Sequence, residues 1–144
     1  MHLLNKIILS VGALSGIVGA QFKPTSDFPI TWNDPMGMLI VAPLTVLMIF
    51  GIDILRSPKG THWAWPTLEE NPLTLSNPLN IILSIGFAFT ACGIVAVLLN
   101  LFSGNTSLVG PVYFLSGGVG TLIGVKVATT IFRSRFKRNS DERL

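Results

Sequence analysis

Residues 78–132 read PLNIILSIGFAFTACGIVAVLLNLF (78–102), SGNTSLVG (103–110) and PVYFLSGGVGTLIGVKVATTIF (111–132), and this stretch decides the fold. Its two apolar runs each reach the ~20 residues that a bilayer-spanning helix requires. Hydrocarbon offers no water to backbone amides, so such a run must be a helix that bonds its own backbone. Because the connection is short and uncharged, we predict that these two helices form an antiparallel hairpin.

Two further apolar runs lie upstream, at about residues 7–22 and 35–52. The chain has 144 residues, of which 49% are hydrophobic and only 12% charged, so four helices leave no room for a separate soluble domain. We therefore predict an all-α membrane protein, with residues 1–144 forming one integral membrane domain. A basic tail, residues 133–144, follows the last of four transmembrane helices.

The first run has a second interpretation. Met1–Lys6 resembles the start of a signal peptide, and Val18-Gly19-Ala20 would suit signal peptidase. Cleavage there would leave three spans and an N-terminus outside. We expect a retained helix, because Lys6 fits the charge pattern of the whole chain.

Lysines and arginines fall almost entirely on alternate sides of the spans. Lys6 precedes the first run, Arg56 and Lys59 follow the second, and only Lys23 lies between them. After the fourth run come Arg133, Arg135, Lys137, Arg138 and Arg143. The positive-inside rule then predicts that both termini and the loop at 56–79 are cytoplasmic. We expect a bacterial inner membrane, and a eukaryotic membrane is the alternative. We expect the first four of these basic tail residues, Arg133, Arg135, Lys137 and Arg138, to bind anionic lipid.

Small residues recur at every fourth position in the last two runs. The two ladders are Ser84, Ala88, Cys92 and Ala96, and Ser116, Gly120, Gly124 and Ala128. Spacing of four places each ladder on one helix face, where small side chains let two backbones approach closely. In a hairpin centred near residue 106, members of the two ladders lie at equal depth, so we expect them to face each other. Gly12, Gly16 and Ala20 give the first run a shorter ladder, which is the better candidate for the alternative role, oligomerisation.

The longest loop, residues 57–77, contains His62, Trp63, Trp65, Glu69 and Glu70. Two Trp beside a span usually form an interfacial aromatic belt. The alternative is a partner-docking surface formed by these five residues. The sequence from Thr67 to Glu70 also fits a capping box that starts a short helical turn.

Two ionisable residues lie inside or at the edge of the spans. Asp53 follows the second run, and Lys126 interrupts the fourth. They would make a plausible buried charge pair, and a charge inside a membrane is a functional candidate by default. The alternative is that Lys126 extends to the inner headgroups and Asp53 is interfacial. Pro43, inside the second run, should kink its helix, either for gating or to fit a neighbour.

The sequence lacks the usual patterns of enzymes and metal sites. His2 and His62 both lie outside the spans, Cys92 is the only cysteine, and no HExxH, EF-hand or Walker pattern occurs. We therefore expect no enzyme activity, cofactor, metal or nucleic acid. The first hypothesis is an accessory or assembly subunit of a membrane complex, bound to other subunits or to itself. The second is a small homo-oligomeric transporter or pore, with Pro43, Asp53 and Lys126 as moving parts. A third, a phage-type hole-forming protein, fits the size better than the four spans.

Overall fold

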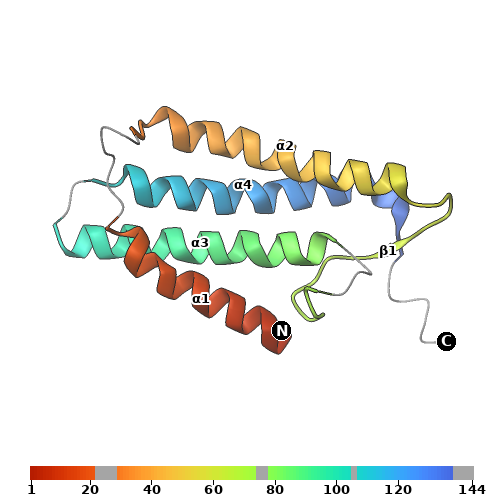
Figure 1. The fold of residues 1–144 in the computed structure, drawn as a ribbon, viewed down its shortest axis with the longest axis horizontal. Coiled ribbons are helices and arrows are strands. Elements are labelled where there is room, and N and C mark those ends of the chain that lie inside the picture. The colour runs from red at the N-terminus through yellow and green to blue at the C-terminus, as the bar shows by residue number, and fades with distance from the viewer. Residues whose placement is uncertain (22–28, 74–77, 105–106, 138–144) are drawn as a thin grey trace.

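The computed structural model describes residues 1–21, 29–73, 78–104 and 107–137, and within these ranges the chain is helical, as predicted. Its four α-helices are α1 (Leu3–Gly19), α2 (Asn33–Arg56), α3 (Leu79–Phe102) and α4 (Val109–Ile131) (Figure 1). A short 3-10 helix, η1 (Arg133–Arg135), follows α4. Two two-residue strands, β1 (Trp63–Ala64) and β2 (Phe136–Lys137), pair in parallel, with Trp63 opposite Phe136. Lys23, Arg138 and Arg143, which entered the charge pattern, lie outside the described residues.

Three of the helices, α2, α3 and α4, are long and apolar enough to cross a membrane. The fourth, α1, is also apolar but has 17 residues. At about 1.5 Å per residue it is about 25 Å long, somewhat less than the ~30 Å of a bilayer core. Helix α2 ends at Arg56, so it continues past the predicted boundary at residue 52 and includes Asp53.

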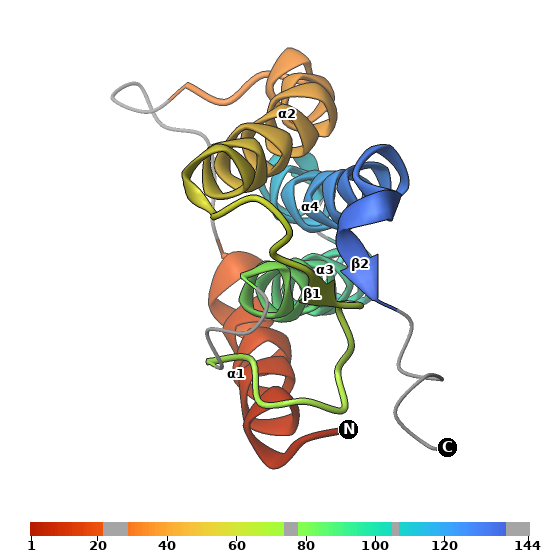
Figure 2. The same ribbon diagram turned by 90° about the vertical axis from the view of Figure 1, so that its right-hand side faces the viewer.

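The four helices lie side by side in a row, in the order α2, α4, α3, α1 (Figures 1 and 2). The inner helices α3 and α4 touch where Gly93 meets Leu115 and where Gly118 meets Thr90. Each outer helix packs mainly along one inner helix, α1 on α3 and α2 on α4. Both outer helices therefore keep broad faces covered by exposed apolar side chains, among them Leu14 and Val18 on α1 and Ile40 and Leu44 on α2.

The small-residue ladders have partners other than those expected. A methyl group built on Gly12 of α1 would lie 2.5 Å from the carbonyl oxygen of Ala88, and one on Gly16 would lie 2.6 Å from that of Cys92. The ladder on α3 therefore packs against α1. On α4, Gly120 and Gly124 lie against Pro43 of α2.

The expectation that the two ladders face each other is therefore corrected. Helix α3 meets α4 through a separate set of small residues, Gly86, Thr90 and Gly93. The glycines of the ladders lie at close backbone contacts. The periodicity could not identify the partner, because each inner helix has two such faces.

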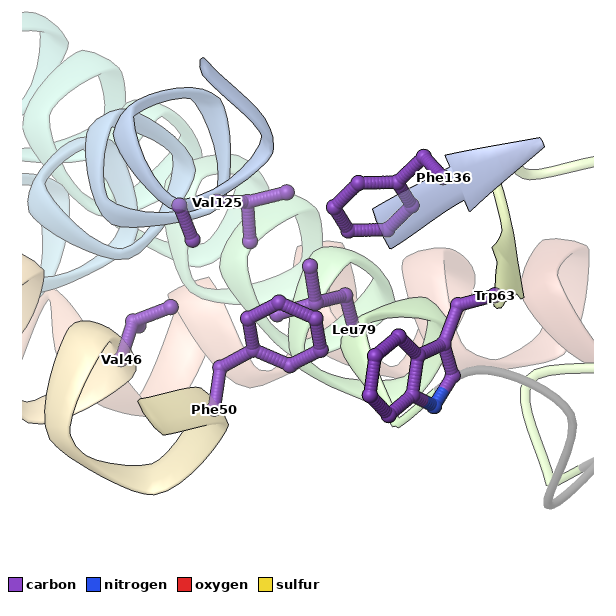
Figure 3. Close-up of a cluster of buried hydrophobic side chains, with 7 residues drawn as sticks. Val46, Phe50, Trp63, Leu79, Val125 and Phe136 are labelled. Atoms are coloured by element: carbon purple, nitrogen blue, oxygen red, sulfur yellow. The ribbon is translucent and has the colours of Figure 1, made fainter. Parts of the chain in front are cut away.

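The aromatic core lies at one end of the row, where the loop after α2 meets the segment after α4 (Figure 3). Phe50 is fully buried at its centre. Its ring stands edge-on to Trp63 at 5.4 Å between centroids, and stacks on Phe136 at 5.6 Å. Leu79 and Val125 close the cluster, so all three long helices contribute to it.

Two predicted local motifs differ in detail. The segment from Thr67 to Glu70 forms a turn, not a helix: the Thr67 hydroxyl accepts from the Glu69 amide at 3.2 Å. The Glu70 side chain is bonded elsewhere, to Asn80, so it cannot reach back as a capping box requires.

Candidate functional site at the loop-bearing end

A buried polar network ties the long loop to α1 and α3. Asn5 is almost fully buried, and its side-chain amide donates to the backbone carbonyls of Leu68 and Glu70, both at 2.9 Å. Its Oδ1 accepts from the Ser84 hydroxyl at 2.5 Å. The loop is therefore fixed to two helices through one asparagine.

Asn80 supplies the second half of the network. Its side chain is fully buried, its Oδ1 accepts from the Thr67 amide at 2.9 Å, and its Nδ2 donates to the Glu70 carboxylate at 3.1 Å. Within the described residues, every buried side-chain nitrogen or oxygen has a hydrogen-bond partner. Fully hydrogen-bonded buried networks hold the chain in one arrangement, so this network fixes the loop against the helices.

Asn5 and Asn80 are the residues that sequence reasoning missed. Asn5 lies just before the first predicted run and Asn80 inside the third, and neither was given a role. The available signal was an amide side chain in the first turns of each of two apolar helices, where nothing else in the sequence explains it. An amide can serve a backbone donor and a backbone acceptor at once, which suits it to holding a loop.

The two tryptophans of the loop have different environments. Trp63 is 6% exposed and packs into the aromatic core, so it is neither a belt residue nor part of an open surface. Trp65 is half-buried and lies 5.2 Å from the Phe136 ring, leaving one side available at the surface. Of the polar candidates, His62 and Glu69 are exposed, whereas Glu70 belongs to the buried network. Of the five residues that the sequence suggested for a docking surface, His62 and Glu69 are the exposed ones.

Asp53 and Lys126 are not brought together. Asp53 is half-buried and lines a hollow of about 560 Å³ beside Arg56 and Trp63. Lys126 is exposed and lines a different hollow, of about 350 Å³, beside Trp65. Within the described part of the chain, the predicted buried charge pair therefore does not form.

A third hollow, of about 590 Å³, lies along α1. Its lining includes Val11, Ser15 and Val18 of α1, Phe89 and Cys92 of α3, and Phe114 of α4. The surface is nearly all apolar, and the Ser15 hydroxyl is already bonded to the carbonyl of Val11 at 2.8 Å. Such a groove suits hydrocarbon and not a polar substrate.

Hydroxyl groups in the middle of the spans bond to their own helices. Thr45, Thr90 and Thr121 each donate to the carbonyl four residues earlier, at 2.8–2.9 Å. In the described ranges, no group of three or more His, Cys, Asp or Glu side chains is placed to hold a metal ion. The described spans therefore present hydrocarbon and bonded hydroxyls at their centres.

Comparison with protein-family models, curated proteins and solved structures gives no match. The three helices that are long and apolar enough to cross a membrane support a membrane protein.

Proposed function

We propose that this protein is a non-enzymatic accessory or assembly subunit of a membrane complex, inserted in a bacterial inner membrane with α1 as a fourth, tilted span. The observation that carries the proposal is the open row of helices (Figure 2). Each outer helix is covered on one side only, so lateral faces on α1 and α2 remain free for other membrane helices. Membrane helices associate through such faces by close packing.

The proposed orientation in the membrane rests on the basic residues at the end of the row that carries the loop. The backbone amide of His2 donates to the carbonyl of Leu68 at 2.8 Å, and β1 pairs with β2, so the N-terminus, the loop and the segment after α4 meet at one end. The basic residues gathered there are Lys6, Arg56, Lys59, Arg133 and Arg135. By the positive-inside rule this end faces the cytoplasm.

The insertion unit we propose is an antiparallel hairpin of α3 and α4. The contacts Gly86 with Leu122, Thr90 with Gly118 and Gly93 with Leu115 run in opposite senses along the two helices, which supports this arrangement. The hairpin forms the centre of the row, and α1 and α2 pack on its two sides.

The alternative, a small homo-oligomeric transporter or pore, is favoured by charged residues beside hollows. Three observations weigh against it. Asp53 and Lys126 line separate hollows, mid-span hydroxyls are bonded to their own helices, and Pro43 lies against the glycines of α4, as expected of a fitted contact.

Purification from native membranes in mild detergent tests the proposal. We expect co-purification of other membrane proteins at fixed stoichiometry, measured by mass spectrometry and light scattering. Glu69→Gln should weaken co-purification at least severalfold, because Glu69 is an exposed acid of the loop. It should leave membrane insertion unchanged, because Glu69 lies outside the buried network. The matched control is Asp34→Asn, an exposed acid at the start of α2 and so at the opposite end. A homo-oligomer with no other protein, together with loss of solute flux in Asp53→Asn, would establish the transporter instead.

A further inference from the structure

Among the described residues that line its hollow, Lys126 is the one charged side chain; the hollow is formed by α3, α4 and the loop. Among the described residues, the lining also includes Trp65, Leu83, Phe87, Leu122 and Thr129, and it contains no carboxylate. The Lys126 side chain is exposed, and α4 is apolar enough to cross a membrane. A cation in that position needs an anion or water to compensate its charge.

The depth of Lys126 suits a headgroup phosphate. It lies five residues before the end of α4, which corresponds to about 7.5 Å along the helix axis. A lysine has a flexible four-carbon stem, so its ammonium group extends from this depth toward the membrane boundary. Trp65, on the loop at the same end of the hollow, is the kind of ring that prefers the headgroup level.

The rest of the hollow suits an acyl chain. Leu83 and Phe87 of α3 and Leu122 of α4 form an apolar wall that runs from the loop toward the centre of the spans. Thr129 carries no charge, and its hydroxyl already donates to the carbonyl of Lys126 at 2.9 Å. One cation above an apolar wall matches one anionic phosphate above a hydrocarbon chain.

We propose that the hollow at Lys126 is a binding site for one anionic phospholipid, whose phosphate pairs with the Lys126 ammonium group beside Trp65. This lipid site rests on the membrane insertion proposed above. It differs from the predicted binding of the basic tail, because it uses a side chain inside a span and an apolar wall that a surface cluster lacks. The hollow beside Asp53 and Arg56 has charges of both signs and so does not favour a net anion.

Native mass spectrometry of the full-length protein tests the site. The protein is extracted from vesicles with equal amounts of phosphatidylglycerol and phosphatidylcholine, and retained lipids are counted. We expect wild-type protein to retain phosphatidylglycerol preferentially. Lys126→Gln should reduce that preference about fivefold, as expected for one basic residue, and Lys126→Arg should keep it. Lys6→Gln, which removes another exposed lysine at the same end, is the matched control and should change the preference little.

A second measurement needs no change at Lys126. Brominated phosphatidylglycerol should quench the fluorescence of the wild-type protein more than brominated phosphatidylcholine, and Trp65→Phe should remove the difference. Equal quenching by the two lipids would overturn the proposal, as would an unchanged lipid preference in Lys126→Gln. If soluble glycerol phosphate competes at millimolar concentration, the site binds free anions and the lipid assignment is wrong. Partner co-purification should survive Lys126→Gln, so failure here is distinguishable from failure of the accessory role.

Discussion

Replacement of Gly12 by alanine tests the close contact between α1 and α3. The added methyl group would lie 2.5 Å from the carbonyl oxygen of Ala88, 2.7 Å from its Cα and 2.8 Å from its carbonyl carbon. All three are backbone atoms, so no side-chain rotation can relieve the clash. Because ordinary contacts lie at 3.4–4 Å, the two helices must separate by about 1 Å locally.

The expected loss follows from two opposing terms. Overpacking of this kind costs ~1–3 kcal/mol. Alanine also favours a helix over glycine by up to ~1 kcal/mol, which offsets part of the loss. We expect Gly12→Ala to lower the free energy of unfolding by about 1–2 kcal/mol. Gly51→Ala in α2 is the matched control: nothing lies within 4 Å of the added methyl, so it should be neutral or stabilising.

A double variant sharpens the test. A methyl on Gly16 would lie 2.6 Å from the carbonyl oxygen of Cys92, one helical turn from the first contact. One separation of α1 from α3 relieves both clashes, so Gly12→Ala with Gly16→Ala should cost less than the sum of the single variants. The assay is reversible unfolding in mixed micelles by titration with sodium dodecyl sulfate, followed by circular dichroism. The same midpoint for Gly12→Ala and wild type, or an equal loss in Gly51→Ala, would refute the backbone contact.

Three further predictions concern the loop-bearing end and the topology. Asn80→Ala should destabilise the protein by ~1–3 kcal/mol, because the Thr67 amide loses its acceptor; wild-type unfolding in the same titration would show that water replaces it. Phe136→Ala should cost ~3–5 kcal/mol and increase proteolysis of the loop, unless the Phe50 cluster closes over the gap. Single cysteines at Asn105 and Ser140, in a cysteine-free background, should be labelled by impermeant reagents from opposite sides of the membrane; outside labelling at Ser140 would refute cytoplasmic termini.

The spans were predictable because bilayer thickness and backbone hydrogen bonding leave few choices. Runs of ~20 apolar residues identified α2, α3 and α4, and only their ends moved by a few residues. Pro111 shows why ends move: it is the first residue of the predicted run 111–132, yet α4 begins at Val109. A proline is tolerated anywhere in the first turn, where amides have no helical acceptor.

The loop could not be predicted in the same way, because its structure depends on contacts distant in sequence. From its position beside a span, Trp63 is expected in an aromatic belt. In the structure it instead packs inside the protein, in the cluster around Phe50 and Phe136. The role of Asn5 depends on Leu68 and Ser84, which lie more than sixty residues away. Such partners are visible only once the helices are placed.

The pairing of β2 with β1 has a consequence for synthesis. Phe136 completes the shell around Phe50, yet it leaves the ribosome only after all four helices. Until then, the Phe50 and Trp63 rings lack one of their covers, and a nascent chain stalled before residue 136 would present an unfinished aromatic surface. Proteases and chaperones recognise exposed apolar surface of this kind. Closure of the aromatic core therefore waits for β2, because Phe136 is translated after Phe50 and Trp63.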